Sequence, residues 1–271
     1  GLTALDLSYS NLTTLFRNSG LSVYKNANLQ KLFLNYAFGK NVQLGFLANF
    51  PNLIEIDLSS VDKILFTSSD QPMFKSLKKL QRISLSNLSL NSSFMDSYFN
   101  VSLLGDLESL DLSYNDLEYF PGYFQNKFNN KFKSLNMSNN RLKYFDLVDL
   151  PYYALTLSLI DLSNNYITSL DASIPPSVQS FVCDKLLLRN NNIRDLDLLD
   201  AQFVSFFHVL NLDLSLNSIT SLKIIQKRHS VSLISITDFN LITLWASNNN
   251  LEDIPDFATF RNVAVHNNRL V

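Results

Sequence analysis

The chain has 271 residues, of which 46% are hydrophobic and 17% are charged, and its formal net charge is −2. This length is enough to bury a sizeable core, and the charge balance is not that of a nucleic-acid-binding protein. The single cysteine excludes a disulfide framework, a cysteine-type zinc site and a CxxC redox centre. Because no apolar run reaches roughly 18 residues, we expect no membrane span in this segment.

One phrase, LxxLxLxxNxL, recurs from the first residues to the last. Its clear copies begin at Leu107, Phe132, Leu157, Cys183 and Val209, and its looser copies at Leu2, Leu29, Leu53, Leu80, Leu241 and Phe260. These starts, about eleven in all, mostly lie about 24 to 27 residues apart, the spacing of leucine-rich repeats. We predict that residues 1–271 form a single solenoid of about eleven repeats, uncapped at both ends. Because solenoids need polar capping repeats, we expect it to be a segment of a longer protein.

Each copy of the phrase predicts one short strand. Its LxL core alternates with period two, so Leu110 and Leu112 should point inward while Asp111 and Ser113 point outward. Strands from coils that turn the same way must pair in parallel. The predicted fold is an α/β solenoid, a right-handed horseshoe with a parallel sheet on its concave face and mostly irregular or short helical convex segments. Apolar residues three positions beyond the phrase should close the core: Leu15, Phe66, Phe120, Phe145, Leu170, Leu196, Leu222 and Ile254.

The asparagine at the ninth position of the phrase predicts a structural ladder. The chain turns sharply there, and an amide side chain can both donate to and accept from buried backbone groups. The predicted ladder contains Asn115, Asn140, Asn165, Asn191, Asn217, Asn249 and Asn268. The first four coils have Ser10, Ala37, Val61 and Leu88 instead, so we expect locally irregular coils between Ala37 and Leu88.

The outward residues of the strands form the candidate binding face. Its central column is Asp6, Phe33, Asp57, Ser84, Asp111, Asn136, Asp161, Leu187, Asp213, Trp245 and Ala264. The aspartates fit either a solvated face or a site for Ca²⁺ or a basic ligand. Exposed aromatic residues are frequent in binding hot spots, although a return loop or flanking repeat can also cover them. The predicted ligand-binding residues are Tyr9, Phe33, Tyr36, Tyr114, Arg189, Trp245 and His266.

A long interval between two phrases contains a small basic group. Its members are Lys223, Lys227, Arg228 and His229. Insertions in solenoids fall on one face and often bind, but a solvated return loop explains the same residues.

Five NxS/T sequons mark candidate glycosylation sites. They begin at Asn11, Asn87, Asn91, Asn100 and Asn136. They accept glycans only in a secreted chain, and in a chain so rich in Asn and Ser their number does not establish the compartment.

Catalysis has little support in the sequence. His208, His229 and His266 lie on separate coils, there is no glycine-rich phosphate loop, and no HExxH or Cys/His metal-ligand spacing occurs. Cys183 occupies a core position of its repeat, which predicts an inert buried thiol. We therefore expect no catalytic residues, no cofactor and no metal site.

These repeats resemble those of the leucine-rich repeat superfamily over practically the whole chain. The stretch LDLSYNDL at Leu110–Leu117, the similar stretch around Asp161, the uneven repeat length and the IPPSVQS stretch from Ile174 resemble the extracellular repeats of Toll-like receptors. That resemblance implies an extracellular or cell-surface location and ligand-induced pairing of ectodomains, and thus a homo-oligomer of the parent protein.

The expected function is non-enzymatic recognition of a protein or glycan ligand on the concave face, within a receptor or adhesion protein. Two alternatives remain open. One is a cytoplasmic scaffold or regulatory subunit, which the unpaired cysteine fits. The other is a filament or matrix component that assembles through the ends of the solenoid.

Overall fold

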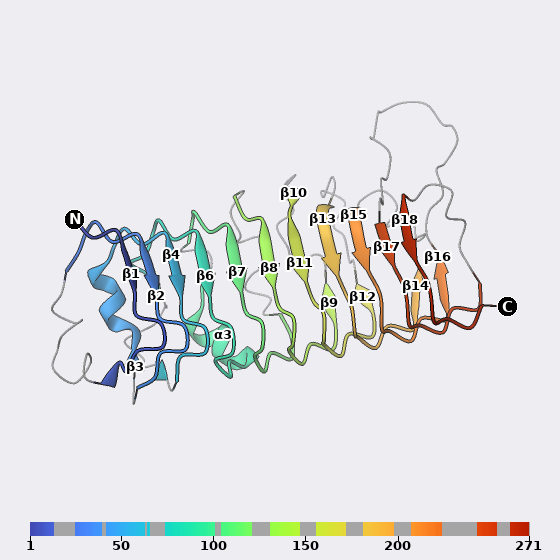
Figure 1. The fold of residues 1–271 in the computed structure, drawn as a ribbon, viewed down its shortest axis with the longest axis horizontal. Helices are drawn as coiled ribbons and strands as arrows, with labels where there is room; N and C mark the ends of the chain where they lie inside the picture. The colour runs from blue at the N-terminus through green and yellow to red at the C-terminus, as the bar shows by residue number, and fades with distance from the viewer. Residues whose placement is uncertain are drawn as a thin grey trace, which may run out of the picture. The chain divides into compact units, whose positions relative to one another are not determined.

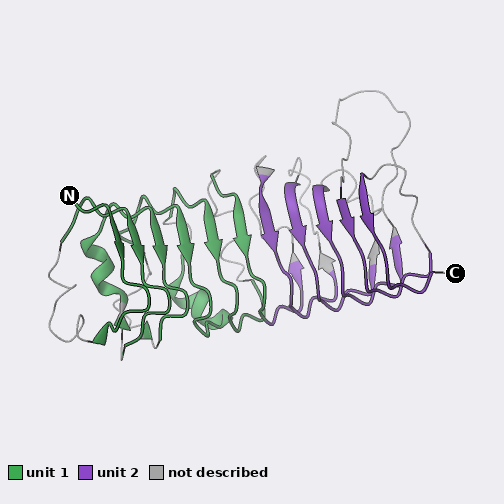
Figure 2. Ribbon diagram, in the orientation of Figure 1, with its two compact units in different colours: residues 1–140 green, residues 141–271 purple. Residues whose placement is uncertain are grey.

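The computed structural model describes most of the chain as two compact units. The described residues are 1–13, 25–39, 42–62, 64–65, 74–100, 104–120, 131–146, 156–171, 181–197, 207–223, 243–253 and 261–270. Unit 1 is Gly1–Asn140 and unit 2 is Arg141–Val271 (Figure 2). The single-domain organisation expected from the repeats stays a prediction.

Unit 1 contains a sheet whose described strands all run in parallel (Figure 1). Its strands, in order, are β1 (Ala4–Asp6), β2 (Lys31–Phe33), β4 (Glu55–Asp57), β6 (Arg82–Ser84), β7 (Ser109–Asp111) and β8 (Ser134–Asn136). The return segments hold the paired strands β3 (Val42–Gln43) and β5 (Ile64–Leu65), the 3₁₀ helix η1 (Leu44–Asn49) and the helix α3 (Ser92–Tyr98). The side chain of Asn91 caps α3, because its Oδ1 accepts the N–H of Phe94 at 2.9 Å.

Unit 2 repeats this arrangement with longer central strands. Its sheet contains β11 (Leu159–Asp161), β13 (Phe181–Leu187), β15 (Phe207–Asp213), β17 (Thr243–Trp245) and β18 (Asn262–Ala264), and β10 (Thr156–Leu157) also pairs with β13. On the return side, β9 (Phe145–Asp146) pairs with β12 (Leu170–Asp171), and β14 (Asp195–Asp197) with β16 (Ser221–Lys223). The predicted solenoid of parallel strands is confirmed, with few helices on its return side.

The leucines of the phrase form the core in both units. Leu110 and Leu112 are fully buried and Asp111 is partly exposed, as the period-two pattern predicts. The outward position predicted for Ser113 is wrong, because this residue lies in the turn after the strand and is buried. The predicted closing residues Phe120, Phe145 and Leu222 are also buried. Leu15, Phe66 and Ile254 lie outside the described residues, and the side chains of Leu170 and Leu196 are not described.

The predicted asparagine ladder is present. Asn191 is typical: its Nδ2 donates to the carbonyls of Leu162 and Leu188, both at 3.0 Å, and its Oδ1 accepts the N–H of Ile167 at 3.0 Å. Each amide therefore satisfies backbone groups of its own coil and of the coil before it. Equivalent bonds are made by Asn115, Asn140, Asn165, Asn217, Asn249 and Asn268.

The strand side stays regular where the ladder is missing, so the expected irregularity between Ala37 and Leu88 is wrong for the sheet. Strands β2, β4 and β6 pair without a break in register. The N–H of Leu12, which an asparagine at position 37 would accept, donates instead to the carbonyl of Phe38 at 2.7 Å. Phe38 N–H in turn donates to the carbonyl of Ser10 at 3.0 Å. Backbone pairing between coils replaces the amide, and Ala37 and Val61 can then be buried without unpaired polar groups.

None of the helices within the described part of the chain is long and apolar enough to cross a membrane.

Asn191→Leu should lower the free energy of unfolding by about 1–3 kcal/mol, because it leaves buried carbonyl and N–H groups without partners. Urea unfolding of the variant and the parent chain measures this loss. The matched control is Asn192→Leu, since the neighbouring Asn192 is exposed. Equal midpoints for the two variants would show that the ladder does not stabilise the coil.

Candidate binding surface

The aspartates in the central column of the strand face close the turns that follow the strands. Asp6, Asp57 and Asp111 each accept, through Oδ1, the N–H of the serine two residues later at 2.9 Å. In unit 2, Asp161 and Asp213 make the same bond at the same length. These Asx turns guide the chain out of the strand. They explain why aspartate recurs at this position without requiring a ligand.

Asn136 shows that the turn does not need a negative charge. Its Oδ1 accepts the N–H of Ser138 at 3.1 Å, in the same geometry as the aspartates. At Asp6, the hydroxyl and then the N–H of Ser8 hold the pKa of the carboxyl below its ordinary value, so this group is ionised at neutral pH. Within the described part of the chain, no group of three or more His, Cys, Asp or Glu side chains could hold a metal ion.

The residue before the ladder position adopts a left-handed backbone conformation in every described coil. Asparagine tolerates this region, but bulky residues are strained there by about 1–2 kcal/mol. Tyr9, Tyr36 and Tyr114 nevertheless occupy it, with φ of 59°, 56° and 56°. The strained backbone directs three aromatic side chains into solvent at the strand exits.

An aromatic patch, which we define as Tyr9, Phe33 and Tyr36, lies on the first two coils of unit 1. The rings of Tyr9 and Tyr36 stack with their centroids 5.1 Å apart and their planes 5° from parallel. Tyr9 is 69% exposed and Tyr36 is 52% exposed. An open depression of about 610 Å³ adjoins the stack and is lined by Asp6, Ser8, Tyr9, Phe33 and Asn35.

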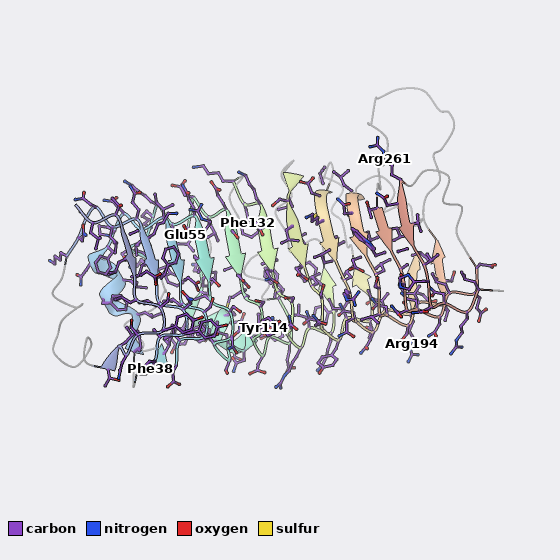
Figure 3. The ribbon with its side chains drawn as sticks, viewed as in Figure 1. Phe38, Glu55, Tyr114, Phe132, Arg194 and Arg261 are labelled. Atoms are coloured by element: carbon purple, nitrogen blue, oxygen red, sulfur yellow. The ribbon has the colours of Figure 1, made fainter. Side chains whose placement is uncertain are left out.

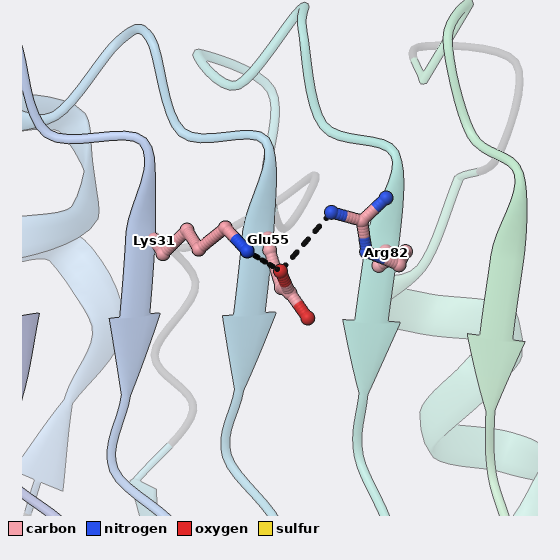
Figure 4. Close-up of polar contacts among 3 residues, drawn as sticks. All are labelled: Lys31, Glu55 and Arg82. Carbon is pink, nitrogen blue, oxygen red and sulfur yellow. Dashed lines mark hydrogen bonds and ion pairs between the residues drawn. The ribbon is translucent and has the colours of Figure 1, made fainter. Parts of the chain in front are cut away.

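A three-residue charge cluster runs across the same sheet, one row away from the central column (Figure 4). Glu55 on β4 contacts Lys31 on β2 at 3.1 Å and Arg82 on β6 at 3.0 Å. The hydrogen bond from Arg82 is the main reason why the pKa of Glu55 is lowered, and Lys31 adds to the effect. Both cations contact the same carboxylate of Glu55, so the cluster has a net charge of +1.

The remaining predicted residue of unit 1, Tyr114, stands apart from the patch. Ser60 and Asn87 occupy its repeat position in the two intervening coils, which places Tyr114 about 14 Å from Tyr36 at three strand spacings. Phe38 was not predicted as a ligand-binding residue, yet its side chain is 49% exposed. The side chains of Phe38 and Tyr114 both lie on the side where the strands end (Figure 3). The backbone of Phe38 forms a β-bridge with Asn11, and no side-chain pattern predicts that bridge.

The predicted residues of unit 2 form no comparable cluster. Trp245 is 38% exposed and lies in register between Asp213 and Ala264. His266 is exposed, and its Nδ1 lies 3.0 Å from Ser247 Oγ. Arg189 is exposed on a different coil, between those of Asp161 and Asp213. Tyr144 and Tyr166, which were not predicted, are more than half exposed.

Cys183 is a core residue, as predicted. It is fully buried, and its Sγ lies 3.1 Å from the carbonyl oxygen of Lys185. Burial raises the pKa of the thiol to about 12, which keeps it protonated and unreactive at neutral pH.

Four of the five candidate glycosylation sites are exposed: Asn11, Asn87, Asn91 and Asn100. A glycan on Nδ2 of Asn91 would leave its Oδ1 free to cap α3. The fifth, Asn136, is only partly exposed on the strand face. Of the basic group, Lys223 ends β16 with its side chain not described, and Lys227, Arg228 and His229 lie outside the described residues.

Comparison with known proteins identifies the repeat. A family model described as Leucine Rich Repeat matches residues 106–127. The leucine-rich repeat domain of APL1B is 19% identical, with a TM-score of 0.60 over 92% of this chain and 64% of that one. Residues 106–127 thus match a leucine-rich repeat, and the chain has the fold of leucine-rich repeat proteins. Its specific resemblance to Toll-like receptors is not among these findings.

Other solved structures share the fold at low identity. A leucine-rich repeat protein of Leptospira interrogans is 23% identical, with a TM-score of 0.57 over 90% of this chain and 62% of that one. The plant peptide hormone receptor RGFR1, solved in complex with RGF2, is 21% identical, with a TM-score of 0.50 over 83% and 33%. The chain thus spans less than two thirds of each of these structures. A sequence search of curated proteins found no match.

Tyr114→Asn should stabilise the protein by about 0.5–1 kcal/mol, because asparagine adopts the left-handed conformation at lower cost. Tyr36→Asn relieves the same strain but also removes the stack with Tyr9, which is worth about 0.5–1.5 kcal/mol, so it should give little or no gain. The urea midpoints of the two variants make the comparison. Equal stabilisation at both positions would contradict a stabilising role for the stack.

Glu55→Gln should destabilise the protein by about 0.5–1 kcal/mol at pH 7, the range of partly exposed ion pairs. Because the folded pKa of Glu55 is lowered from 4.5, its contribution is present above pH 4.5 and is lost as the pH falls through the folded value. Urea unfolding at pH 7 and at pH 3 should therefore show a difference from the parent chain that shrinks in acid. The exposed Glu252, changed to Gln, should show no such trend.

Proposed function

We propose that this chain is a non-enzymatic recognition module that binds a protein partner through the strand face of unit 1, within an extracellular receptor or adhesion protein. The leucine-rich repeat fold is typical of protein-binding modules. The observation that carries the proposal is the exposed aromatic patch beside an open depression on that face. Tyrosine anchors of this kind are enriched among the residues that dominate binding energy.

The rigidity of the face favours binding with little ordering cost. The strands pair in continuous register, and the turns that follow them are fixed by Asx bonds. Tyr9 and Tyr36 hold each other by stacking, so a partner does not need to immobilise two free rings. A preformed aromatic surface of this kind suits recognition of a partner.

Two observations support an extracellular location. Four sequons are exposed, three of them clustered at Asn87, Asn91 and Asn100, where glycans would not cover the aromatic patch on the first two coils. The structural relative RGFR1 is a peptide hormone receptor. The free, buried Cys183 favours the second candidate, a cytoplasmic scaffold, because reduced cysteines are ordinary there.

Photo-crosslinking in intact cells tests both the surface and the compartment. The full-length parent protein carries p-benzoylphenylalanine in place of Tyr36, and surface proteins are labelled with a membrane-impermeant biotin reagent before lysis. We expect a surface-biotinylated protein adduct that is lost when Tyr9 is also changed to Asn.

The matched control places the crosslinker at Tyr166, which is 54% exposed and lies outside the strands of the sheet. Adducts of equal yield from Tyr36 and Tyr166 would contradict a site at the aromatic patch. Adducts found only in the unbiotinylated fraction would favour the cytoplasmic scaffold, and adducts to glycan alone would contradict a protein partner.

A further inference from the structure

We propose that the depression between β1 and β2 is an arginine subsite: it receives one guanidinium group of a basic segment of the partner, which stacks on Phe33 and Tyr9 and donates hydrogen bonds to Asp6. This inference rests on the proposed function and adds the chemistry of the ligand. It also assigns a role to Phe33, which interrupts the aspartates of the central column.

Phe33 lies directly between two carboxylates. The register pairs Asp6 with Phe33 and Phe33 with Asp57, so one ring on β2 has an acidic residue on each neighbouring strand, about 4.8 Å away. Each carboxylate uses one oxygen for its own turn, to Ser8 N–H and Ser59 N–H respectively. A carboxylate offers about four acceptor positions, so both retain capacity for a ligand.

The polar lining of the depression offers hydrogen-bond acceptors and contains no positively charged side chain. Asp6, Ser8 and Asn35 supply a carboxylate, a hydroxyl and an amide oxygen, and Ser8 Oγ lies 2.5 Å from Asn35 Oδ1. A guanidinium group brings five N–H donors in one plane and no acceptor. Its plane also stacks on aromatic rings, which the depression provides in Phe33 and Tyr9.

The nearest cation is held away from this site. Lys31 precedes Phe33 by two residues on β2, but its Nζ is bound to Glu55 on the opposite side, toward β4 (Figure 4). Among the residues that the structure describes, neither Asp6 nor Asp57 has an ion-pair partner. Asp6 is therefore unpaired beside the exposed ring of Tyr9 and the half-buried ring of Phe33, an arrangement that complements an arginine side chain.

The test uses three blocked heptapeptides, acetyl-GSGXGSG-amide, in which X is arginine, citrulline or lysine. Citrulline keeps the planar shape of arginine but has no charge. NMR titration of the chain should show saturable shifts of the Asp6, Tyr9 and Phe33 signals with the arginine peptide. We expect at least fivefold weaker binding of the citrulline and lysine peptides, and weaker binding of the arginine peptide in high salt.

Two variants locate the effect. Asp6→Asn should weaken the arginine peptide at least threefold while preserving the turn, because Asn136 makes the same turn bond with an amide oxygen. Phe33→Leu should weaken it similarly, since leucine is accommodated at this repeat position as Leu187 on β13. Asp111→Asn is the matched control, and it should leave binding unchanged because Asp111 lies between Ser84 and Asn136 rather than beside a ring.

Equal binding of arginine and citrulline peptides, tighter binding of lysine, or unchanged binding in Asp6→Asn would each overturn the arginine subsite. Absence of saturable shifts at 20 mM peptide would overturn it too. These outcomes are independent of the crosslinking result at Tyr36. If the arginine peptide does not bind while the Tyr36 adduct persists, the subsite is wrong and the protein-binding function stands. If the adduct is lost while the peptide still binds, the proposed function is wrong although the depression binds arginine.

Discussion

The structure depends on satisfying the backbone groups that each coil buries as it leaves its strand. Backbone N–H and C=O groups in an exposed loop can bond to water, but those buried between stacked coils cannot. A buried group without a partner destabilises the fold. Asparagine amides meet this need from Asn115 onward, with one side chain bonding to two coils. In the first coils, direct backbone pairing around Phe38 meets it instead. Both solutions preserve the spacing of the sheet.

The sequence predicted the features that depend on a repeated pattern. The period-two burial of Leu110 and Leu112, the parallel pairing and the amide ladder follow from residue types that recur at fixed spacing. The regular sheet between Ala37 and Leu88 was not predicted, because the replacement bonds are made by backbone atoms, which every residue has. A side-chain pattern cannot reveal a bridge such as Asn11 to Phe38.

The candidate site was predicted only in part, because the sequence shows which side chains recur but not how the backbone is arranged around them. Tyr9, Phe33 and Tyr36 were predicted as ligand-binding residues on the strand face, and the structure places Tyr9 and Tyr36 in a stack. Their left-handed backbone was not predicted, because tyrosine is a poor residue for that conformation. The charge cluster around Glu55 was also missed, although Lys31, Glu55 and Arg82 share one repeat position and a comparison of that row would have revealed it.

The aromatic residues of the central column lack the turn hydrogen bond that aspartate makes at this position, so they stabilise the local fold less. Aspartate or asparagine at this position closes the turn with a hydrogen bond, as at Asp6 and Asp57. Phe33 and Trp245 cannot accept that bond, and their rings face the strand surface rather than the core. Two neighbouring coils with strained tyrosines add a second cost at the same end of unit 1. Because the buried ladder and backbone bridges hold each coil even where this turn bond is missing, single positions of the column can carry residues that favour a ligand over the fold.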